Sequence, residues 1–320
     1  MRPRPLVAVS VMAVAVALIG AACSPGGERP AGVDQTPGSG LVAQVASYEV
    51  VAGEENRLIV GLLTEENRLV VGGEVEFRFT YLGEEASPQS ESAGAASAGF
   101  LPLPGQEETA LPDRPTVVSP AEARGVYRAQ AVTFDRPGFY QVEVRADLGG
   151  GDVRTATAAF EVVAEPAYPA PGDRAPRTEN LTLGSDAPPE AIDSRAALEG
   201  EVPDRELHRT TIADALRRGR PALVVFATPV YCVSQFCGPV TDMVAGLARD
   251  HPGVAEFIHV EIWRNFQEQS VNRAAAEWLL RNENLTEPWV FLIGSDGRIL
   301  ARWDNVATRE EIEPWLERLR

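Results

Sequence analysis

Hydrophobic and polar residues alternate along much of the first half of the chain. Residues 74–81, which read Glu-Val-Glu-Phe-Arg-Phe-Thr-Tyr, are the clearest example. A period of two predicts a strand with one buried face and one face in water. Because such segments recur at short spacing, with turns and no helical stretches between them, residues 41–164 are predicted to form an all-β sandwich. The predicted strands lie at residues 58–63, 74–81, 125–134, 139–146 and 154–163.

Two segments of this half differ from the alternating pattern. Residues 84–120 contain many Ser, Ala, Gly and Pro residues, and this composition predicts a long solvated loop within the sandwich. Residues 165–180 contain four prolines between positions 166 and 176. Closely spaced prolines favour an extended chain, so this segment is predicted to be a semi-rigid linker between two domains.

The hydrophobic pattern changes from residue 181 onward, where strand and helix periods alternate. Residues 222–226 form a continuous apolar run, which is typical of a buried strand, and the apolar residues between 240 and 247 share one helix face. Residues 181–320 are therefore predicted to form an α/β domain. The predicted strands are 222–226, 256–263, 289–293 and 298–303, and the predicted helices are 211–218, 240–249, 271–282 and 309–319.

The N-terminus carries the features of a targeting signal. Arg2 and Arg4 precede an apolar run over residues 6–19, and small residues lead to Cys23. This arrangement resembles a bacterial lipoprotein signal, which implies that residues 1–23 include the signal and that Cys23 is lipidated. Residues 24–40 are rich in Gly, Pro and Ser and are predicted to be a flexible tether. We therefore expect an extracytoplasmic protein anchored to the cell membrane through lipid on Cys23.

Composition narrows the range of partners. Of the 320 residues, 44% are hydrophobic and 23% are charged, as in ordinary globular proteins. The chain has 46 acidic and 29 basic residues and a net charge of -17. An acidic chain without a concentrated basic patch repels a polyanion, so nucleic acid is not expected as a partner.

Two cysteines lie where redox chemistry would need them. Cys232 and Cys237 follow the apolar strand and precede a predicted helix. A cysteine at a helix N-terminus has a lowered pKa, and the thiolate is the reactive species. Pro239 suits the first helical turn, which places Cys237 or Gly238 at the cap. Residues five apart in an α-helix have Cα atoms roughly 8.6 Å apart, beyond the usual disulfide reach of about 7 Å. The segment between the two cysteines is therefore predicted not to be regular helix when they are joined.

The region around this pair resembles the redox motif of the thioredoxin superfamily. The likeness lies in the strand, residues 227–239 and the following helix, and a second segment, residues 287–299, is similar to the one that carries a cis-proline in membrane-anchored thioredoxin-like proteins. The spacing departs from the family, being C-x4-C rather than C-x2-C. The resemblance implies a thioredoxin-like domain over 181–320, with Cys232 and Cys237 as the catalytic pair and Pro288 as the cis-proline. The two arguments differ on the attacking cysteine. The position at the helix cap favours Cys237, whereas the resemblance favours Cys232, and the sequence does not choose between them.

The sandwich has a weaker resemblance of its own. Residues 134–144 are similar to immunoglobulin-like bacterial domains of the YtkA and FixH type, in which a Pro-Gly-x-Tyr corner packs the tyrosine ring against a turn. Tyr140 would be that corner residue. The expected architecture is thus an immunoglobulin-like sandwich followed by a thioredoxin-like domain.

The expected function is that of a thiol-disulfide oxidoreductase that exchanges electrons with protein or small-molecule thiols and disulfides. No cofactor and no metal site are expected. The direction of electron flow and the identity of the substrate do not follow from the spacing. A permanently oxidised structural disulfide in a non-enzymatic binding scaffold is one alternative.

Two further alternatives come from related chemistry. Sco-type copper chaperones use C-x3-C and a histidine far downstream, whereas the histidines here are His208, His251 and His259. Q-type peroxiredoxins carry Thr-Pro-x-Cys with a resolving cysteine, and residues 228–237 resemble that pattern with one residue inserted.

Overall fold

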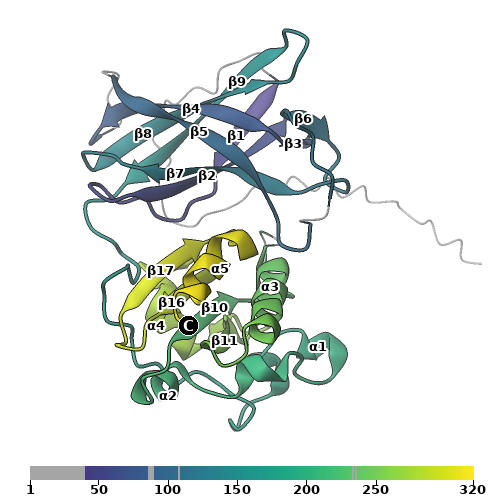
Figure 1. The fold of residues 1–320 in the computed structure, drawn as a ribbon, viewed down its shortest axis with the longest axis vertical. Coiled ribbons are helices and arrows are strands. Elements are labelled where there is room, and N and C mark those ends of the chain that lie inside the picture. Colours follow the sequence, from purple (N-terminus) through teal and green to yellow (C-terminus); the bar gives the residue numbers. More distant parts are fainter. Residues whose placement is uncertain (1–39, 86–89, 107–108, 233, 235) are drawn as a thin grey trace, which may run out of the picture.

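The computed structural model describes residues 40–320 except 86–89, 107–108, 233 and 235. Strands account for 39% of the described residues and helices for 17%. Figure 1 shows a large β region packed above a smaller sheet that carries the helices. The predicted signal, Cys23 with its predicted lipidation, and most of the predicted tether lie outside the described residues. No helix in the part of the chain that the structure describes is both long and apolar enough to cross a membrane.

The β region is a nine-stranded antiparallel sheet with the order β6-β3-β2-β7-β5-β4-β8-β9, and β1 pairs with β2. Strand β5 pairs with β4 along its first part and with β7 along its last four residues. This change of partner makes the sheet compatible with a sandwich. The strands are β1 (Leu41–Val45), β2 (Asn56–Thr64), β3 (Leu69–Val71), β4 (Glu74–Gly83), β5 (Glu91–Pro102), β6 (Thr116–Val118), β7 (Gly125–Val132), β8 (Gly138–Asp147) and β9 (Val153–Val162).

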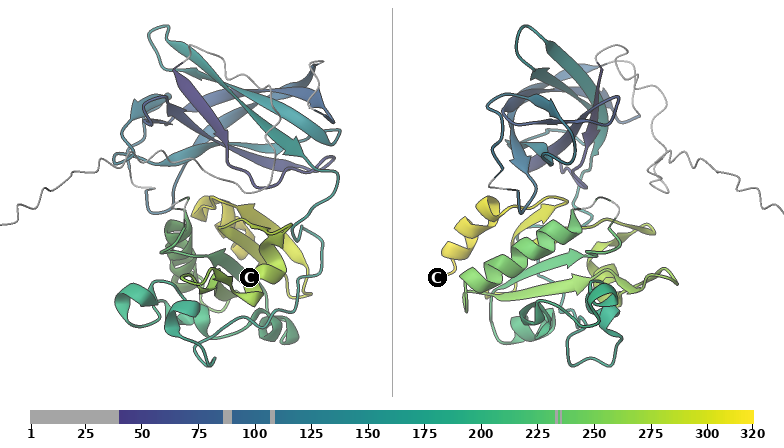
Figure 2. Two further views of the ribbon diagram at one scale, coloured as in Figure 1. Left: turned by 180° about the vertical axis from the view of Figure 1, so that it is seen from behind. Right: turned by 90° about the vertical axis from the view of Figure 1, so that its right-hand side faces the viewer.

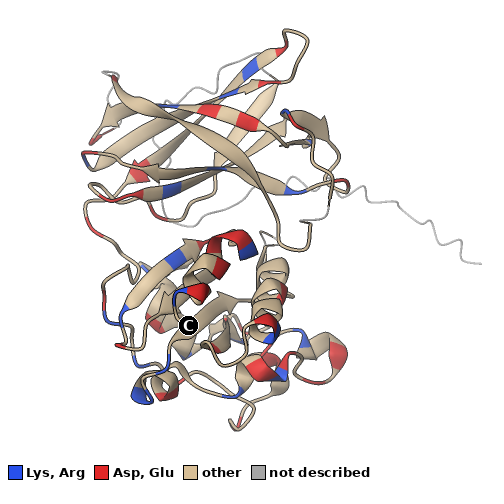
Figure 3. Ribbon diagram, viewed as in Figure 1, with Lys and Arg blue, Asp and Glu red and all other residues tan. Residues whose placement is uncertain are grey.

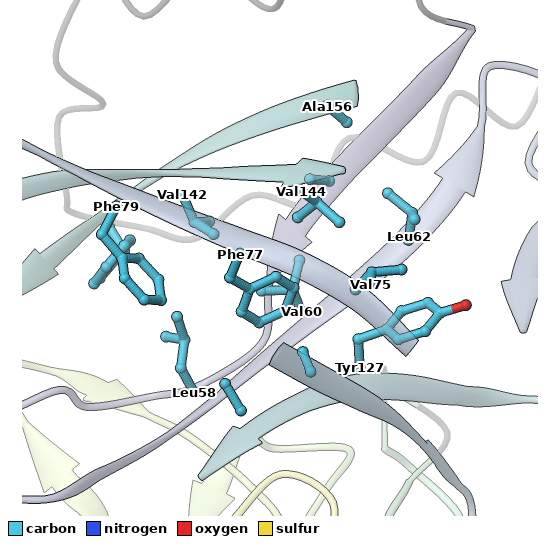
Figure 4. Close-up of a cluster of buried hydrophobic side chains, with 14 of the residues drawn as sticks. Leu58, Val60, Leu62, Val75, Phe77, Phe79, Tyr127, Val142, Val144 and Ala156 are labelled. Atoms are coloured by element: carbon cyan, nitrogen blue, oxygen red, sulfur yellow. The ribbon is translucent and has the colours of Figure 1, made fainter. Parts of the chain in front are cut away.

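Alternate residues of these strands build the core of the β region, as the period of two predicts. Phe77 and Phe79 of β4 point into a cluster with Leu58 and Val60 of β2 and Val142 of β8 (Figure 4). All five side chains are almost completely shielded from solvent. Burial of this kind is the main stabilising contribution to a β-sandwich.

The prediction of a long loop at residues 84–120 is wrong. Residues 91–102 form β5, a 12-residue strand, and residues 116–118 form β6. The first seven residues of β5 are all exposed or half-buried. This part of the strand has no buried face, and its sequence therefore shows no clear alternation of hydrophobic and polar residues. The strand conformation is determined by backbone hydrogen bonds to β4 and β7, which amino-acid composition cannot predict.

A second, four-stranded sheet has the order β11-β10-β16-β17, with β10 and β11 parallel and the other pairs antiparallel. Helices α3 and α5 cover one face, and α2 and α4 cover the other (Figure 2). The strands of this region are β10 (Ala222–Ala227), β11 (Glu256–Glu261), β12 (Trp263–Asn265), β13 (Ser270–Val271), β14 (Leu280–Arg281), β15 (Asn284–Leu285), β16 (Trp289–Ile293) and β17 (Ile299–Asp304). The helices are η1 (Pro189–Ala191), α1 (Ala196–Glu199), η2 (Arg205–His208), α2 (Ile212–Arg217), α3 (Cys237–Asp250), α4 (Arg273–Leu279) and α5 (Arg309–Glu317).

The structure does not indicate the thioredoxin-like α/β domain that the resemblance implied. The chain is mainly β, and its largest element is the antiparallel sheet of the first half. Three of the four predicted helices are shorter than the periodicity predicted, whereas α3 is longer, because it begins at Cys237 rather than at residue 240. The helix expected at 271–282 covers only Arg273–Leu279, because the chain then turns into the β14–β15 hairpin through the positive φ angles of Asn282 and Glu283. The predicted fold class therefore holds only in its coarser part, a β-rich chain with a large antiparallel sheet compatible with a sandwich.

The proline-containing segment between the two regions packs against the second sheet instead of spanning solvent. The backbone N–H of Gly172 donates to the carbonyl of Ile299 at 2.8 Å, and that of Ala175 donates to Gly297 at 2.9 Å. The ring of Tyr168 lies 4.9 Å from that of Trp289. These contacts hold residues 168–175 along β16 and β17.

Ion pairs join the β region to the second sheet. Glu311 of α5 accepts hydrogen bonds from Arg57, with Oε1 2.7 Å from its Nε, and forms an ion pair with Arg128 at 2.8 Å. The carboxylate is largely buried, and although burial raises its pKa, the two arginines bring the pKa of Glu311 below its ordinary value. Elsewhere acidic and basic residues are interspersed over both regions (Figure 3).

Candidate functional site

Cys232 lies in the loop between β10 and α3, and Cys237 is the first residue of α3. β10 ends at Ala227, and α3 begins at Cys237 with Phe236 as its N-cap, one residue before the predicted cap. Pro239 is the third helical residue. Cys237 has no exposed surface, whereas Cys232 is half-buried in the loop before the helix. None of the described residues from Cys232 to Phe236 is helical, as a joined pair would require.

Three reactive groups meet at this loop. The sulfur atoms of Cys232 and Cys237 and a carboxylate oxygen of Glu287 all lie within 4.8 Å of one another. Both cysteines are free thiols. Glu287 comes from the segment before β16, and the Glu287–Pro288 peptide bond is cis. The structure therefore brings Cys232 and Cys237 together with the residue before Pro288, which lies at least 50 positions farther along the chain.

The environment of Cys232 favours its thiolate. A hydrogen bond with Cys237 lowers its pKa most, burial acts in the opposite direction, and Ser234 and the backbone N–H groups of Cys237 and Phe236 lower it further. The result is a pKa of about 6. The Ser234 hydroxyl lies 3.2 Å from the Cys232 sulfur. Hydrogen bonds to the charged form and the open N-terminal turn of a helix are the usual causes of such a shift.

Cys237 and Glu287 have the opposite tendency. Burial, followed by the hydrogen bond and charge of Cys232, raises the pKa of Cys237 well above its ordinary value. Burial, the charge of Cys232 and the charge of Glu261 together raise the pKa of Glu287 to about 8. Within the described residues, no hydrogen bond or ion pair reaches the Glu287 carboxylate. At neutral pH the site thus holds one thiolate, at Cys232, beside two protonated acids.

The β region closes one side of the site. Tyr48, between β1 and β2, donates a hydrogen bond from its hydroxyl to the backbone carbonyl of Glu287. Phe236 packs against an apolar cluster drawn from both regions, which consists of Ile59, Leu101, Leu103, Val126 and Val306. Burial and then the charges of Glu287 and Cys237 raise the pKa of Tyr48, consistent with its position beside the sulfurs. Cys237 is shielded on this side.

An aromatic cluster adjoins the cysteine loop through Tyr231, the residue before Cys232. The ring of Tyr231 stacks on that of Phe266 with centroids 3.9 Å apart and planes at 2°, and Trp263 meets Phe266 edge-on at 5.5 Å. Phe266 is 37% exposed. Through this small aromatic cluster the β12–β13 hairpin packs against the cysteine loop.

A second cluster of titratable groups lies beneath the loop. Asp193, His208 and His259 are completely buried, and one ligand-type atom of each lies within 4.8 Å of the others. The Asp193 carboxylate also accepts a 2.7 Å hydrogen bond from Arg195. His251, the third histidine, lies apart and bonds to Glu313 at 3.2 Å.

Either cluster is close enough for its atoms to surround a metal ion. The cysteine cluster offers two sulfurs and one oxygen, a donor set that suits a thiophilic ion such as Zn²⁺. A copper site of two cysteines and a histidine is not formed within the described residues, because no histidine groups with the sulfurs. In the other cluster, His259 already faces an acceptor with each ring nitrogen, Asp193 with Nδ1 and the Ala227 carbonyl with Nε2.

Sequence reasoning found Cys232, Cys237 and Pro288 but missed Glu287, Tyr48 and Ser234. Glu287 adjoins the proline already singled out, and Ser234 lies between the cysteines, so proximity in sequence could have pointed to both. Tyr48 comes from the other region, more than 180 residues before Cys232, and no local pattern marks it.

Two comparisons of the sequence with known proteins were negative. The chain matches no protein-family model, and no curated protein matches its sequence. The resemblances to the thioredoxin superfamily and to YtkA- and FixH-type domains are therefore not supported, and the predominance of strand argues against the first. The function must be inferred from the chemistry of the site.

Proposed function

We propose that the protein is a thiol-disulfide oxidoreductase that uses Cys232 and Cys237. The Cys232 thiolate attacks one sulfur of a substrate disulfide, and the other substrate sulfur leaves with the bonding electrons and takes a proton from solvent. Cys237 then loses its proton and attacks Cys232. The second substrate thiol is released, and the protein pair becomes a disulfide. Two electrons pass from the protein to the substrate, and the reverse sequence oxidises a dithiol.

The observation that carries this proposal is the unequal ionisation of two adjacent sulfurs. Cys232 is half-buried with a pKa of about 6, and Cys237 is buried with a raised pKa. An accessible thiolate next to a protected thiol is what attack and resolution require. A structural disulfide would need no such difference, because neither sulfur would have to ionise in the folded protein.

We further propose that the substrate approaches from the side of Tyr231 and Phe266, because the β region covers the opposite side through Tyr48 and Phe236. The expected substrates are thiols and disulfides of proteins or small molecules. The predicted lipid anchor on Cys23 belongs to the same proposal and would hold the site outside the cytoplasm at the membrane surface.

Equilibration of the full chain with glutathione buffers tests the proposal. We expect a reversible two-electron transition, lost in the Cys232→Ser and Cys237→Ser variants. The Cys237→Ser variant should accumulate a mixed disulfide on Cys232, whereas Cys232→Ser should accumulate none. A reduction potential below about -300 mV, typical of structural bridges, would instead support a scaffold with a permanent disulfide.

A further inference from the structure

His259 of β11 lies between two hydrogen-bond acceptors. Its Nδ1 is 3.2 Å from Oδ2 of Asp193, and its Nε2 is 3.1 Å from the carbonyl oxygen of Ala227. A carbonyl and an ionised carboxylate only accept hydrogen bonds, so both ring nitrogens must carry hydrogen. The side chain has no exposed surface. Hydrogen-bond geometry thus assigns a buried imidazolium cation to His259.

The partner of this cation is suited to hold it. Asp193 accepts hydrogen bonds from Arg195 and His208 in addition to His259. Burial raises the pKa of Asp193, but the charge of His259 and these hydrogen bonds bring it well below its ordinary value. Burial likewise lowers the pKa of His259, and the charge and hydrogen bond of Asp193, with the charge of Glu261, more than offset this and raise it. The two residues form a buried ion pair.

The Ala227 carbonyl belongs to the peptide group that also contains the Thr228 N–H. That N–H faces the Cys237 sulfur, and Ala227 and Cys237 pack in the same apolar cluster. Nitrogen and oxygen of a peptide group share electrons by resonance, so a cation bound at the oxygen makes the N–H a stronger donor. The cation on one side of this peptide is therefore felt by the sulfur on the other. Ser194, next to Asp193, fixes the same loop by accepting a 3.2 Å hydrogen bond from the Val230 N–H.

We propose that His259, held as a cation by Asp193, is a positioning residue of the redox site that acts through the Ala227–Thr228 peptide to promote ionisation of Cys237. The inference rests on the proposed thiol-disulfide chemistry and concerns its second step. In that step the Cys237 thiol gives its proton to solvent, its sulfur bonds to Cys232, and the substrate sulfur leaves with the electron pair of the broken disulfide.

His208 provides a matched control. It is as deeply buried as His259, its Nε2 lies 3.2 Å from the same Asp193 oxygen, and the two rings are 5.2 Å apart. Within the described residues, however, its hydrogen bonds do not extend to the Ala227–Thr228 peptide. Replacing His208 disturbs the cluster without removing the cation from that peptide.

The experiment uses the reduced full chain and the symmetrical disulfide of thionitrobenzoate. Attack by Cys232 releases one thionitrobenzoate, and attack by Cys237 releases the second, so absorbance resolves the two steps. His259→Asn retains a donor toward Asp193 and loses the one toward Ala227. We expect this variant to slow the second release about tenfold at neutral pH, equivalent to about one pKa unit, and to shift its pH profile upward. His208→Asn should stay within about twofold of the unaltered protein.

Several outcomes separate this inference from the proposed function. The role of His259 is overturned if His259→Asn releases the second thionitrobenzoate at the unaltered rate and with the unaltered pH profile. It is also overturned if His208→Asn slows the second release equally. If the unaltered protein shows no first release, the proposed function itself fails. His259→Gln, which keeps a neutral donor near the Ala227 carbonyl, provides a second variant should His259→Asn not fold. We expect it to be slowed as well, because the charge is lost, and an unaltered rate there counts against the inference.

Discussion

The hydroxyl of Tyr48 donates a hydrogen bond to the backbone carbonyl of Glu287, the residue whose carboxylate lies beside both cysteine sulfurs. Tyr48 belongs to the β region and Glu287 to the second sheet. The backbone N–H of Tyr48 also donates to Asp304 at the end of β17. The β region therefore contributes residues that border the cysteine site directly.

Tyr48→Phe tests how much the hydrogen bond from Tyr48 to the Glu287 carbonyl contributes to stability. The ring would still pack 5.8 Å from Trp289, but the Glu287 carbonyl would lose its donor. We expect the free energy of unfolding to fall by about 1 kcal/mol, measured by denaturant titration. Tyr81→Phe is the control, because its exposed hydroxyl donates to the Pro137 carbonyl at 3.3 Å and its loss should cost less. Equal effects in both variants would contradict a special role for Tyr48.

The low pKa of Cys232 predicts reactivity in mildly acidic solution. The rate of alkylation at Cys232 should rise with pH through a midpoint of about 6, because the thiolate is the reactive form. Cys237 should remain unmodified over the same range. Ser234→Ala removes a hydrogen bond that stabilises the thiolate, so the midpoint should move upward. Mass spectrometry of alkylated protein measures both rates, and a midpoint near 8.5, that of a free cysteine, would refute the assignment.

Glu287 predicts a loss of stability with rising pH. Its folded-state pKa of about 8 exceeds the ordinary value of 4.5, so the folded state binds more protons than the unfolded state between these limits. The contribution of Glu287 is therefore fully present below about pH 4.5 and is lost as pH rises through about 8. Glu287→Gln should become progressively more stable than the unaltered reduced protein over this window. Denaturant titrations at several pH values measure the difference, and a constant difference would contradict the prediction.

Phe236 should couple the packing between the regions to the protection of Cys237. Phe236→Ala removes a half-buried ring from the apolar cluster that contains Leu101 and Val306, and we expect a loss of about 1.5 kcal/mol in the free energy of unfolding. Cys237, the next residue, should be alkylated faster in the folded protein. Phe266→Ala is the control, because this ring is 37% exposed and lies outside that cluster, so its loss should leave the protection of Cys237 unchanged. Unchanged protection of Cys237 in Phe236→Ala would show that other residues shield it.

Local sequence patterns predicted some elements well and others poorly. The strand at residues 74–81 and the buried strand at 222–226 were recognised because each presents a hydrophobic period that its environment preserves. Strand β5 was missed because its small residues carry no period and its neighbours determine its conformation. The helix expected at 271–282 was too long because the chain turns into a hairpin at Asn282.

The sequence by itself determined that Cys232 and Cys237 follow a buried strand and lie close to the start of a helix, because strand and helix periods are local properties. Only the tertiary structure decided which sulfur ionises and what surrounds it. The pKa of a thiol depends on burial and on nearby charges, and Glu287, Tyr48 and His259 reach the site from segments distant in sequence. Such contacts exist only after the sheets have packed together.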